Sequence, residues 1–194
     1  MSAHPLTTFT YETFGQQFGD LLLAGRGEKP GGRRRLHLTE SEAGAQADWV
    51  IELVGNRLPC GDEPLVLAAL LKLLLSRPTI SPHLEFEITE LLPELGWPDE
   101  WVTRQHVEGI IVGYAGQHYD VRADARAGRR ALETAEGGCY HLLTGYIRGA
   151  MSGTGGLLVR TPGIACFDIG FIEGLKEGRV FFAGMDFGPL QAAE

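Results

Sequence analysis

The chain has 194 residues, 44% of them hydrophobic and 22% charged, proportions that are typical of one folded globular domain. Its longest apolar stretch is too short to cross a bilayer, and its N-terminus lacks the basic start and apolar core of a secretory signal. Three cysteines at wide spacing argue against a disulfide framework and a cysteine-type zinc site, so we expect a cytoplasmic protein.

The formal net charge is −8, whereas a protein that binds duplex DNA usually carries a basic surface. The charges are unevenly distributed along the chain. Residues 1–35 carry five basic and three acidic side chains, and residues 40–108 carry four basic and 13 acidic ones. Residues 120–160 carry six basic and four acidic side chains. Residues 120–160 are therefore better suited to contact phosphate than the acidic residues 40–108.

Residues 1–35 are predicted to form a disordered or weakly docked arm, because glycine and proline interrupt them and no apolar period runs through them. The arm ends in Arg33–Arg35, which suit either a phosphate-seeking arm or a solvated tail. Residues 36–194 are predicted to form one domain. Its first strand is predicted at Ala47–Val54, and a helix that starts at Glu40 is the competing interpretation.

The next segment alternates helical and strand patterns. Pro64 suits the first turn of a helix, and Leu65–Ser76 is apolar around most of its circumference, which predicts a central buried helix. Leu84–Ile88 alternates with a period of two, as a half-buried strand does. Thr89 is predicted to be the N-cap of a short helix over Glu90–Leu95.

Gly96 is predicted to be the C-cap of this short helix. A turn at Trp97–Asp99 follows, and then a further helix with Thr103 as its N-cap. Four apolar residues at helical spacing should form its buried face, namely Val107, Ile110, Ile111 and Tyr114. The opposite face includes Gln105 and Glu108.

A β-hairpin, the wing, is predicted next, with strands at Gln117–Arg122 and Cys139–Arg148 and a loop at 123–138 that is rich in glycine, arginine and alanine. A turn at Gly153–Gly156 follows it. The later elements are strands at Leu157–Arg160, Ile164–Asp168 and Val180–Ala183 and a helix at Phe171–Glu177 closed by Gly178. The predicted fold class is therefore α+β, a winged helix-turn-helix with additional β-strands.

The sequence Leu95–Asp99, LGWPD, in its helix–strand–helix context resembles a turn of the plasmid replication initiator protein A family. The members of this family are winged-helix replication initiators. The other similar motifs are Leu58-Pro59, Asp62-Glu63, Leu65–Leu73, Phe86, Leu91-Leu92, Val107, Ile110-Ile111, Gly116, Ala127–Arg130 and Phe171–Gly178. The resemblance covers roughly residues 45–190 and is to the first winged-helix domain of the family. It implies recognition of double-stranded DNA at a plasmid origin, a role in DNA replication, and contact with replication proteins or with a second copy of the chain.

Two groups of residues are candidate DNA contacts. Arg104, Gln105 and His106 lie on the second helix of the motif, where Arg can read guanine and Gln can read adenine; a polar, solvent-facing surface is the competing interpretation. Arginines of the wing are expected to contact phosphates, which positions a protein without specifying sequence. These are Arg122, Arg126, Arg129 and Arg130. Trp97 and Trp101 are expected to pack the turn against the core.

No motif predicts catalysis, a metal or a cofactor. The six histidines form no metal-ligand pair at helical spacing, and the glycine-rich turn at Gly153 lacks the P-loop lysine. We therefore expect a protein that is not an enzyme. An alternative hypothesis is a winged-helix module that dimerises or docks on a partner protein through its acidic helical half, without direct origin binding. A transcriptional regulator of the same fold is a further alternative.

Overall fold

The computed structural model describes residues 33–42, 45–55, 60–123, 138–149, 151–154 and 157–177. The helices are α3 (Pro64–Ser76), α4 (Ile88–Leu95), α5 (Trp101–Ala115) and α7 (Ile169–Lys176). The strands are β1 (Arg33–Glu42), β2 (Ala45–Val54), β3 (His83–Phe86), β4 (His118–Ala123), β5 (Gly138–Tyr140), β6 (Leu143–Ile147), β7 (Met151–Thr154), β8 (Leu157–Arg160) and β9 (Gly163–Phe167). Among these described residues, no helix is both long and apolar enough to span a membrane.

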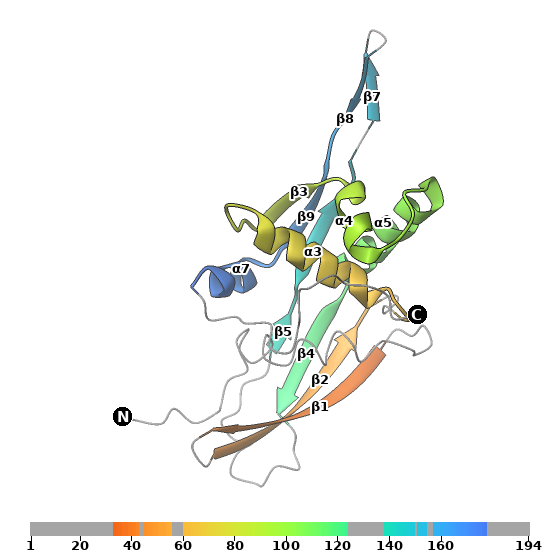
Figure 1. Cartoon of the computed structure of the whole chain (residues 1–194). Helices are drawn as coiled ribbons and strands as arrows, with labels where there is room; N and C mark the ends of the chain where they lie inside the picture. The colour runs from red at the N-terminus through yellow and green to blue at the C-terminus, as the bar shows by residue number, and fades with distance from the viewer. Residues whose placement is uncertain are drawn as a thin grey trace.

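The strands form two sheets and a separate hairpin, and every strand pair is antiparallel (Figure 1). One sheet has four strands in the order β1-β2-β4-β5, and the other has three in the order β3-β9-β6. The hairpin β7–β8 projects away from the helices (Figure 1). Helices and antiparallel sheets together confirm the predicted α+β class.

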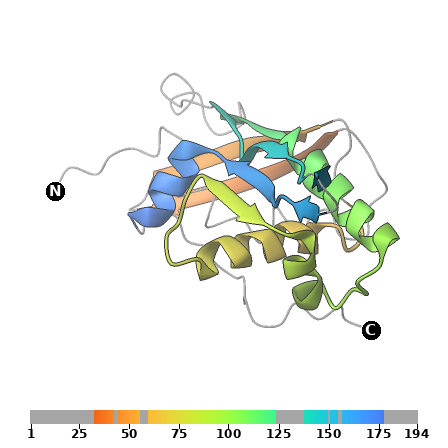
Figure 2. The ribbon, with the colours of Figure 1, turned by 90° about the horizontal axis from the view of Figure 1, so that it is seen from above.

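Helix α3 lies at the centre of one hydrophobic core. All its residues from Pro64 to Leu71 are buried, so the helix must be covered on every side. Helices α4 and α5 pack on it. Leu53 and Val121 of the four-stranded sheet, Phe86 of the small sheet and Phe171 of α7 belong to the same core (Figures 1 and 2). The two sheets and the helices are therefore joined by a single packed interior.

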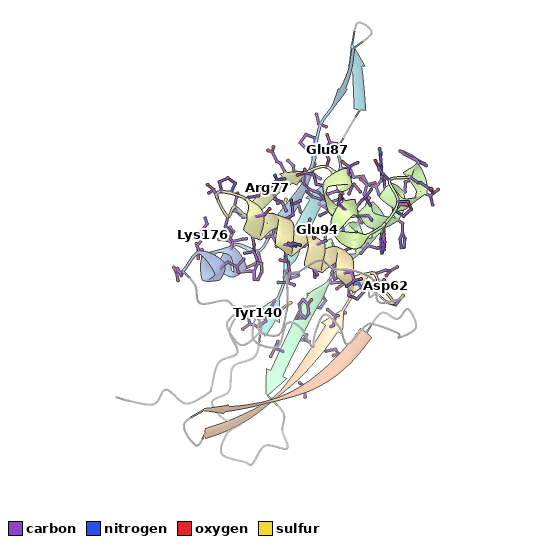
Figure 3. All side chains as sticks on the ribbon, viewed as in Figure 1. Asp62, Arg77, Glu87, Glu94, Tyr140 and Lys176 are labelled. Carbon is purple, nitrogen blue, oxygen red and sulfur yellow. The ribbon has the colours of Figure 1, made fainter. Side chains whose placement is uncertain are left out.

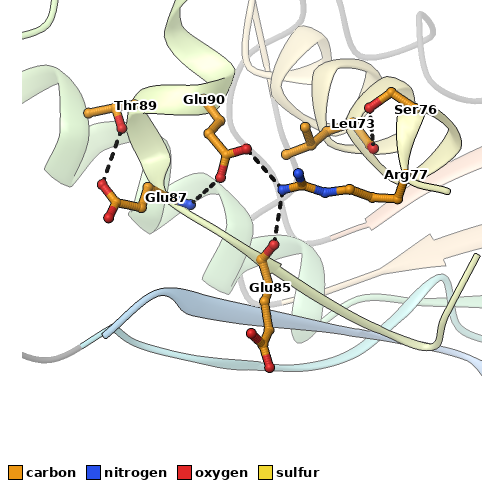
Figure 4. Close-up of polar contacts among 7 residues, drawn as sticks. All are labelled: Leu73, Ser76, Arg77, Glu85, Glu87, Thr89 and Glu90. Atoms are coloured by element: carbon orange, nitrogen blue, oxygen red, sulfur yellow. Dashed lines mark hydrogen bonds and ion pairs between the residues drawn. The ribbon is translucent and has the colours of Figure 1, made fainter. Parts of the chain in front are cut away.

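Arg77 connects three elements where α3 ends (Figure 4). Its Nη2 donates a hydrogen bond to the carbonyl oxygen of Glu85 in β3 at 3.1 Å and forms an ion pair with Oε2 of Glu90 in α4 at 2.9 Å. Oε1 of Glu90 accepts a hydrogen bond from the backbone N–H of Glu87 at 2.9 Å. One side chain thus fixes the end of α3 against β3 and the start of α4.

Several local predictions are confirmed. Helix α3 begins at Pro64 and ends at Ser76, and β3 covers most of the predicted strand at 84–88. Residues 45–54 form β2, which agrees with the predicted first strand. The alternative helix from Glu40 is wrong, because this residue lies in β1 and pairs with Ala47. Strand β1 begins at Arg33, inside the predicted arm, and residues 1–32 lie outside the described part of the chain.

Both predicted N-caps of the helix pair are wrong. Helix α4 is capped at Glu87, whose backbone N–H bonds to the side chain of Glu90, so Thr89 is already helical. Helix α5 begins at Trp101 after Glu100. The backbone N–H of Arg104 bonds to the carbonyl oxygen of Glu100 at 3.0 Å, which places Thr103 inside the first turn. The predicted C-cap is confirmed, since Gly96 has φ 66°.

The predicted wing strand at 139–148 is confirmed only in its first residues, which pair with β4, because the chain changes sheets after them. Strand β5 pairs with β4, whereas β6 pairs with β9. Between them the carbonyl oxygen of Leu142 accepts a hydrogen bond from the N–H of Asp168 at 3.0 Å. Of the turn predicted at Gly153–Gly156, the first two residues belong to β7 (Met151–Thr154), and residues 155–156 lie outside the described part of the chain. The predicted strand at 180–183 and its preceding Gly178 lie outside the described residues.

Replacing Gly96 with alanine is expected to lower the free energy of unfolding by about 1–2 kcal/mol, because a Cβ is strained at φ 66°. Gly109→Ala is the matched control: this helical position is exposed and has open space around the added Cβ, so the free energy of unfolding should rise by roughly 0.5–1 kcal/mol. Urea denaturation measures both changes. If both substitutions changed the free energy of unfolding in the same direction, the assigned roles of the two glycines would be contradicted.

Candidate nucleic-acid interface

The backbone turn at Gly96 sets the geometry between α4 and α5. The left-handed glycine lets the N–H of Trp97 reach back to the carbonyl oxygen of Leu92 at 3.2 Å, which closes α4. Residues 98–100 then lead into α5. The predicted apolar face of α5 is buried in full, and its other face leaves Gln105, Gly109 and Val112 exposed.

The structure brings the predicted base-reading residues together at the start of α5. Arg104 bonds through Nε to Oδ1 of Asp99 at 2.5 Å, and this hydrogen bond and the nearby negative charge raise the pKa of the guanidinium. Gln105 is exposed. His106 is exposed and its ring stacks on Trp97, with centroids 5.9 Å apart. The only cation of the three is therefore held by a carboxylate, and contact of these residues with DNA stays a prediction.

The two tryptophans of this region differ from each other. Trp97 packs against the hydrophobic core, as the sequence predicts. Trp101 is 71% exposed, so its predicted packing against the core is wrong. Its position in the first turn of α5 points it away from the face that carries Val107 and Ile110, which explains the exposure.

The predicted wing arginines lie elsewhere. Arg122 belongs to β4, where its backbone pairs with Val50, and Arg126, Arg129 and Arg130 lie outside the described residues. Strand β4 starts at the C-terminal end of α5 and runs away from the helices (Figure 1). Its six residues span roughly 17 Å at ~3.3 Å per residue. Arg104, in the first turn of α5, is therefore not brought together with Arg122.

Sequence reasoning missed a polar contact between α5 and β6. The hydroxyl of Tyr146 donates to Oε1 of Glu108 at 3.4 Å, and Nε of Arg148 lies 3.7 Å from Oε2 of Glu108. The Arg148 side chain is 67% exposed. Tyr146 and Arg148 are two positions apart in an extended segment, so their side chains lie on the same face. This spacing could have indicated that both side chains contact the same neighbour. The contact fixes α5 against the small sheet.

The Tyr146 phenol has a strongly altered pKa. Burial raises the pKa to about 12, helped by the negative charge of Glu108 and its hydrogen bond, while Arg148 lowers it. Because the folded-state pKa exceeds the ordinary value of 10, the neutral phenol stabilises the fold below pH 10. That contribution is lost as the pH rises from 10 toward 12.

The helical half of the protein is acidic at its surface. Residues 60–109 contain nine acidic and three basic residues. Each of the three cations forms an ion pair within this segment: Lys72 with Glu94, Arg77 with Glu90, and Arg104 with Asp99. Figure 3 shows Glu94 on α4, Glu87 just before α4 and Asp62 just before α3. The described residues contain no group of three or more His, Cys, Asp or Glu placed to hold a metal ion.

Comparison with known proteins shows the fold. No protein-family model matches the chain, and no curated protein matches it. Among solved structures, a selenomethionine derivative of domains 2 and 3 of RctB resembles it with a TM-score of 0.58 and 15% identity, covering 89% of this chain and 63% of that one. Another structure of RctB domains 2–3 has a TM-score of 0.54 and 18% identity, covering 78% and 56%. The chain thus spans less than two thirds of either RctB fragment.

Replacing Glu108 with glutamine should lower the pKa of Tyr146 toward 10, because the charge that opposes the phenolate is removed. Replacing Arg148 with alanine should raise that pKa further. Absorbance at alkaline pH measures the titration, and a Tyr146→Phe variant identifies the contribution of this phenol among the five tyrosines. An unchanged pKa in Glu108→Gln would contradict the contact.

Proposed function

We propose that this chain is the winged-helix module of a replication-initiator-like protein that binds double-stranded DNA and has no catalytic role. The observation that carries the proposal is the element order α3, β3, α4, α5, β6, β9 with the strand order β3-β9-β6. Three packed helices, with one strand of a small antiparallel sheet between the first two helices and the other strands after the third, match a winged helix-turn-helix. The likeness to domains 2 and 3 of RctB, a replication initiator, supports the same class.

In this arrangement α5 is the second helix of the motif, and the wing is the connection from β6 to β9 that β7 and β8 extend (Figure 1). The β4–β5 pair, predicted from the sequence to be the wing, is instead an excursion that completes the four-stranded sheet. Arg148 follows β6 and so stands at the base of the proposed wing, beside α5.

Phosphate contact is proposed for two regions. Arg148 is exposed next to α5, and the residues 124–137 that connect β4 to β5 contain Arg126, Arg129 and Arg130. With a net charge of −8, binding must depend on such local groups. Resemblance to plasmid initiators makes a plasmid origin in the cytoplasm the proposed target, with replication proteins or a second copy of the chain as partners.

A second candidate function is a winged-helix module that binds a protein instead of DNA. The acidic surface of 60–109 favours it, because all three cations of this segment are already ion-paired. A duplex that approached α4 and α5 would meet carboxylates, whereas a basic protein surface would be attracted.

The affinity for a 30-base-pair duplex should fall steeply as salt rises, with a logarithmic slope of about −0.9 for each phosphate contact. The triple variant Arg126→Ala, Arg129→Ala, Arg130→Ala and the single variant Arg148→Ala should each give a shallower slope. Lys176→Ala, at the exposed end of α7, is the matched control and should leave the slope unchanged. Fluorescence anisotropy at several salt concentrations measures the slopes. Zero binding at low salt would remove the DNA hypothesis.

Asp99→Asn tests whether the start of α5 faces the duplex. The substitution removes a negative charge and releases Arg104, so affinity for DNA at low salt should rise several-fold. Glu173→Gln, an equal change of charge on exposed α7, is the control for net charge alone. Equal effects of the two substitutions would place the start of α5 away from the DNA.

A further inference from the structure

A shallow groove of about 500 Å³ lies between the turn that precedes α3 and the first turns of α5. Trp97, Pro98 and Val102 supply most of its apolar lining. Asp62 and Glu63 supply an acidic side. The carboxylate of Glu63 is buried and accepts a hydrogen bond from the backbone N–H of Cys60 at 3.1 Å. The groove therefore combines an apolar floor with fixed carboxylates.

Two large apolar side chains are exposed in the first turn of α5: Val102, which lines the groove, and its neighbour in sequence, Trp101. Trp101 and Val102 are each 71% exposed and follow one another in the first turn of α5. Exposed apolar side chains that adjoin a concave surface are characteristic of protein-interaction sites. Tryptophan is also among the residues that contribute most to binding energy at interfaces. The apolar surface thus continues from the groove onto its rim.

The charge around the groove selects the kind of partner. Asp62, Asp99 and Glu100 are exposed near it, and Arg104, the cation of α5, is ion-paired with Asp99. Stacking of nucleic-acid bases on Trp101 would bring phosphates toward these carboxylates, which like-charge repulsion opposes. A segment that carries positive charge beside an apolar side chain meets both features.

We propose that this groove is a docking site for a basic segment of a partner protein in which one large apolar side chain lies next to Lys or Arg. The apolar side chain covers Val102 and Trp101, and the cation lies near Asp62 and Glu100. This site does not depend on DNA binding. His106 lines the groove and also belongs to the predicted DNA-contacting group, so a docked segment and a duplex compete there.

Binding of short fluorescent peptides to the full chain tests the proposal. The probe is a decapeptide of lysine and arginine with one central tryptophan. One comparison peptide has glutamate at every basic position, and the other has alanine in place of tryptophan. We expect the probe to bind at least tenfold more tightly than either comparison peptide and to shift the indole N–H resonances of Trp97 and Trp101.

Variants locate the site. The double variant Trp101→Ala, Val102→Ala should weaken probe binding at least tenfold, and Asp62→Asn with Glu100→Gln should weaken it several-fold and reduce its salt dependence. Val112→Ala and Ile169→Ala remove exposed apolar side chains elsewhere and should leave binding unchanged. If the tryptophan variant fails to fold, the charge variant and the indole shifts decide the question.

Three results would overturn the proposal. The first is no probe binding up to millimolar concentration. The second is an equal loss of binding in the Val112→Ala and Ile169→Ala controls. The third is that single-stranded or duplex DNA, and not the probe peptide, shifts the two indole resonances at physiological salt.

Discussion

Helix α3 must be covered on all sides, and the rest of the structure follows from that requirement. Each fully buried leucine contributes about 1.5–3 kcal/mol only if apolar neighbours enclose it. No single element can enclose a helix whose residues from Pro64 to Leu71 are all buried. Helices α4 and α5 and side chains from both sheets therefore share its surroundings. That shared core fixes which face of α5 points outward, and so determines where any ligand can approach.

The two proposed functions, binding of DNA and binding of a protein, concern different regions of the surface. Helix α5 contains one basic residue, Arg104, and Asp99 binds it. A helix with this charge distribution has little electrostatic attraction for a duplex. The other candidate cations are Arg148, which is 67% exposed although Glu108 lies 3.7 Å from it, and the three arginines of the segment 124–137, which also carries three acidic residues. A module with this distribution is suited to hold a protein on α4–α5 while other groups contact phosphate.

Local features were predictable from sequence, and long-range ones were not. The breakers Pro64 and Gly96 and the apolar period of α3 and α5 determine structure within a few residues, and each was found. Strand pairing depends on residues far apart, so the division of 139–148 between two sheets left no local signal. The exposure of Trp101 was missed for a related reason. A large apolar residue at the start of a helix is expected to be buried, and only the positions of distant elements show whether anything covers it. Of the candidate site, the sequence identified α5 and its buried face, but neither its first residue nor the ion pair between Arg104 and Asp99.

Strand β9 is central in the small sheet and is also its last strand along the chain, pairing with β3 on one side and β6 on the other. During synthesis the two outer strands emerge from the ribosome well before the one that joins them. A nascent or prematurely terminated chain that ends before Gly163 therefore carries two strands with unpaired edges, and such edges promote aggregation. Completion of this sheet is consequently a late event, and chaperone demand should be greatest just before it.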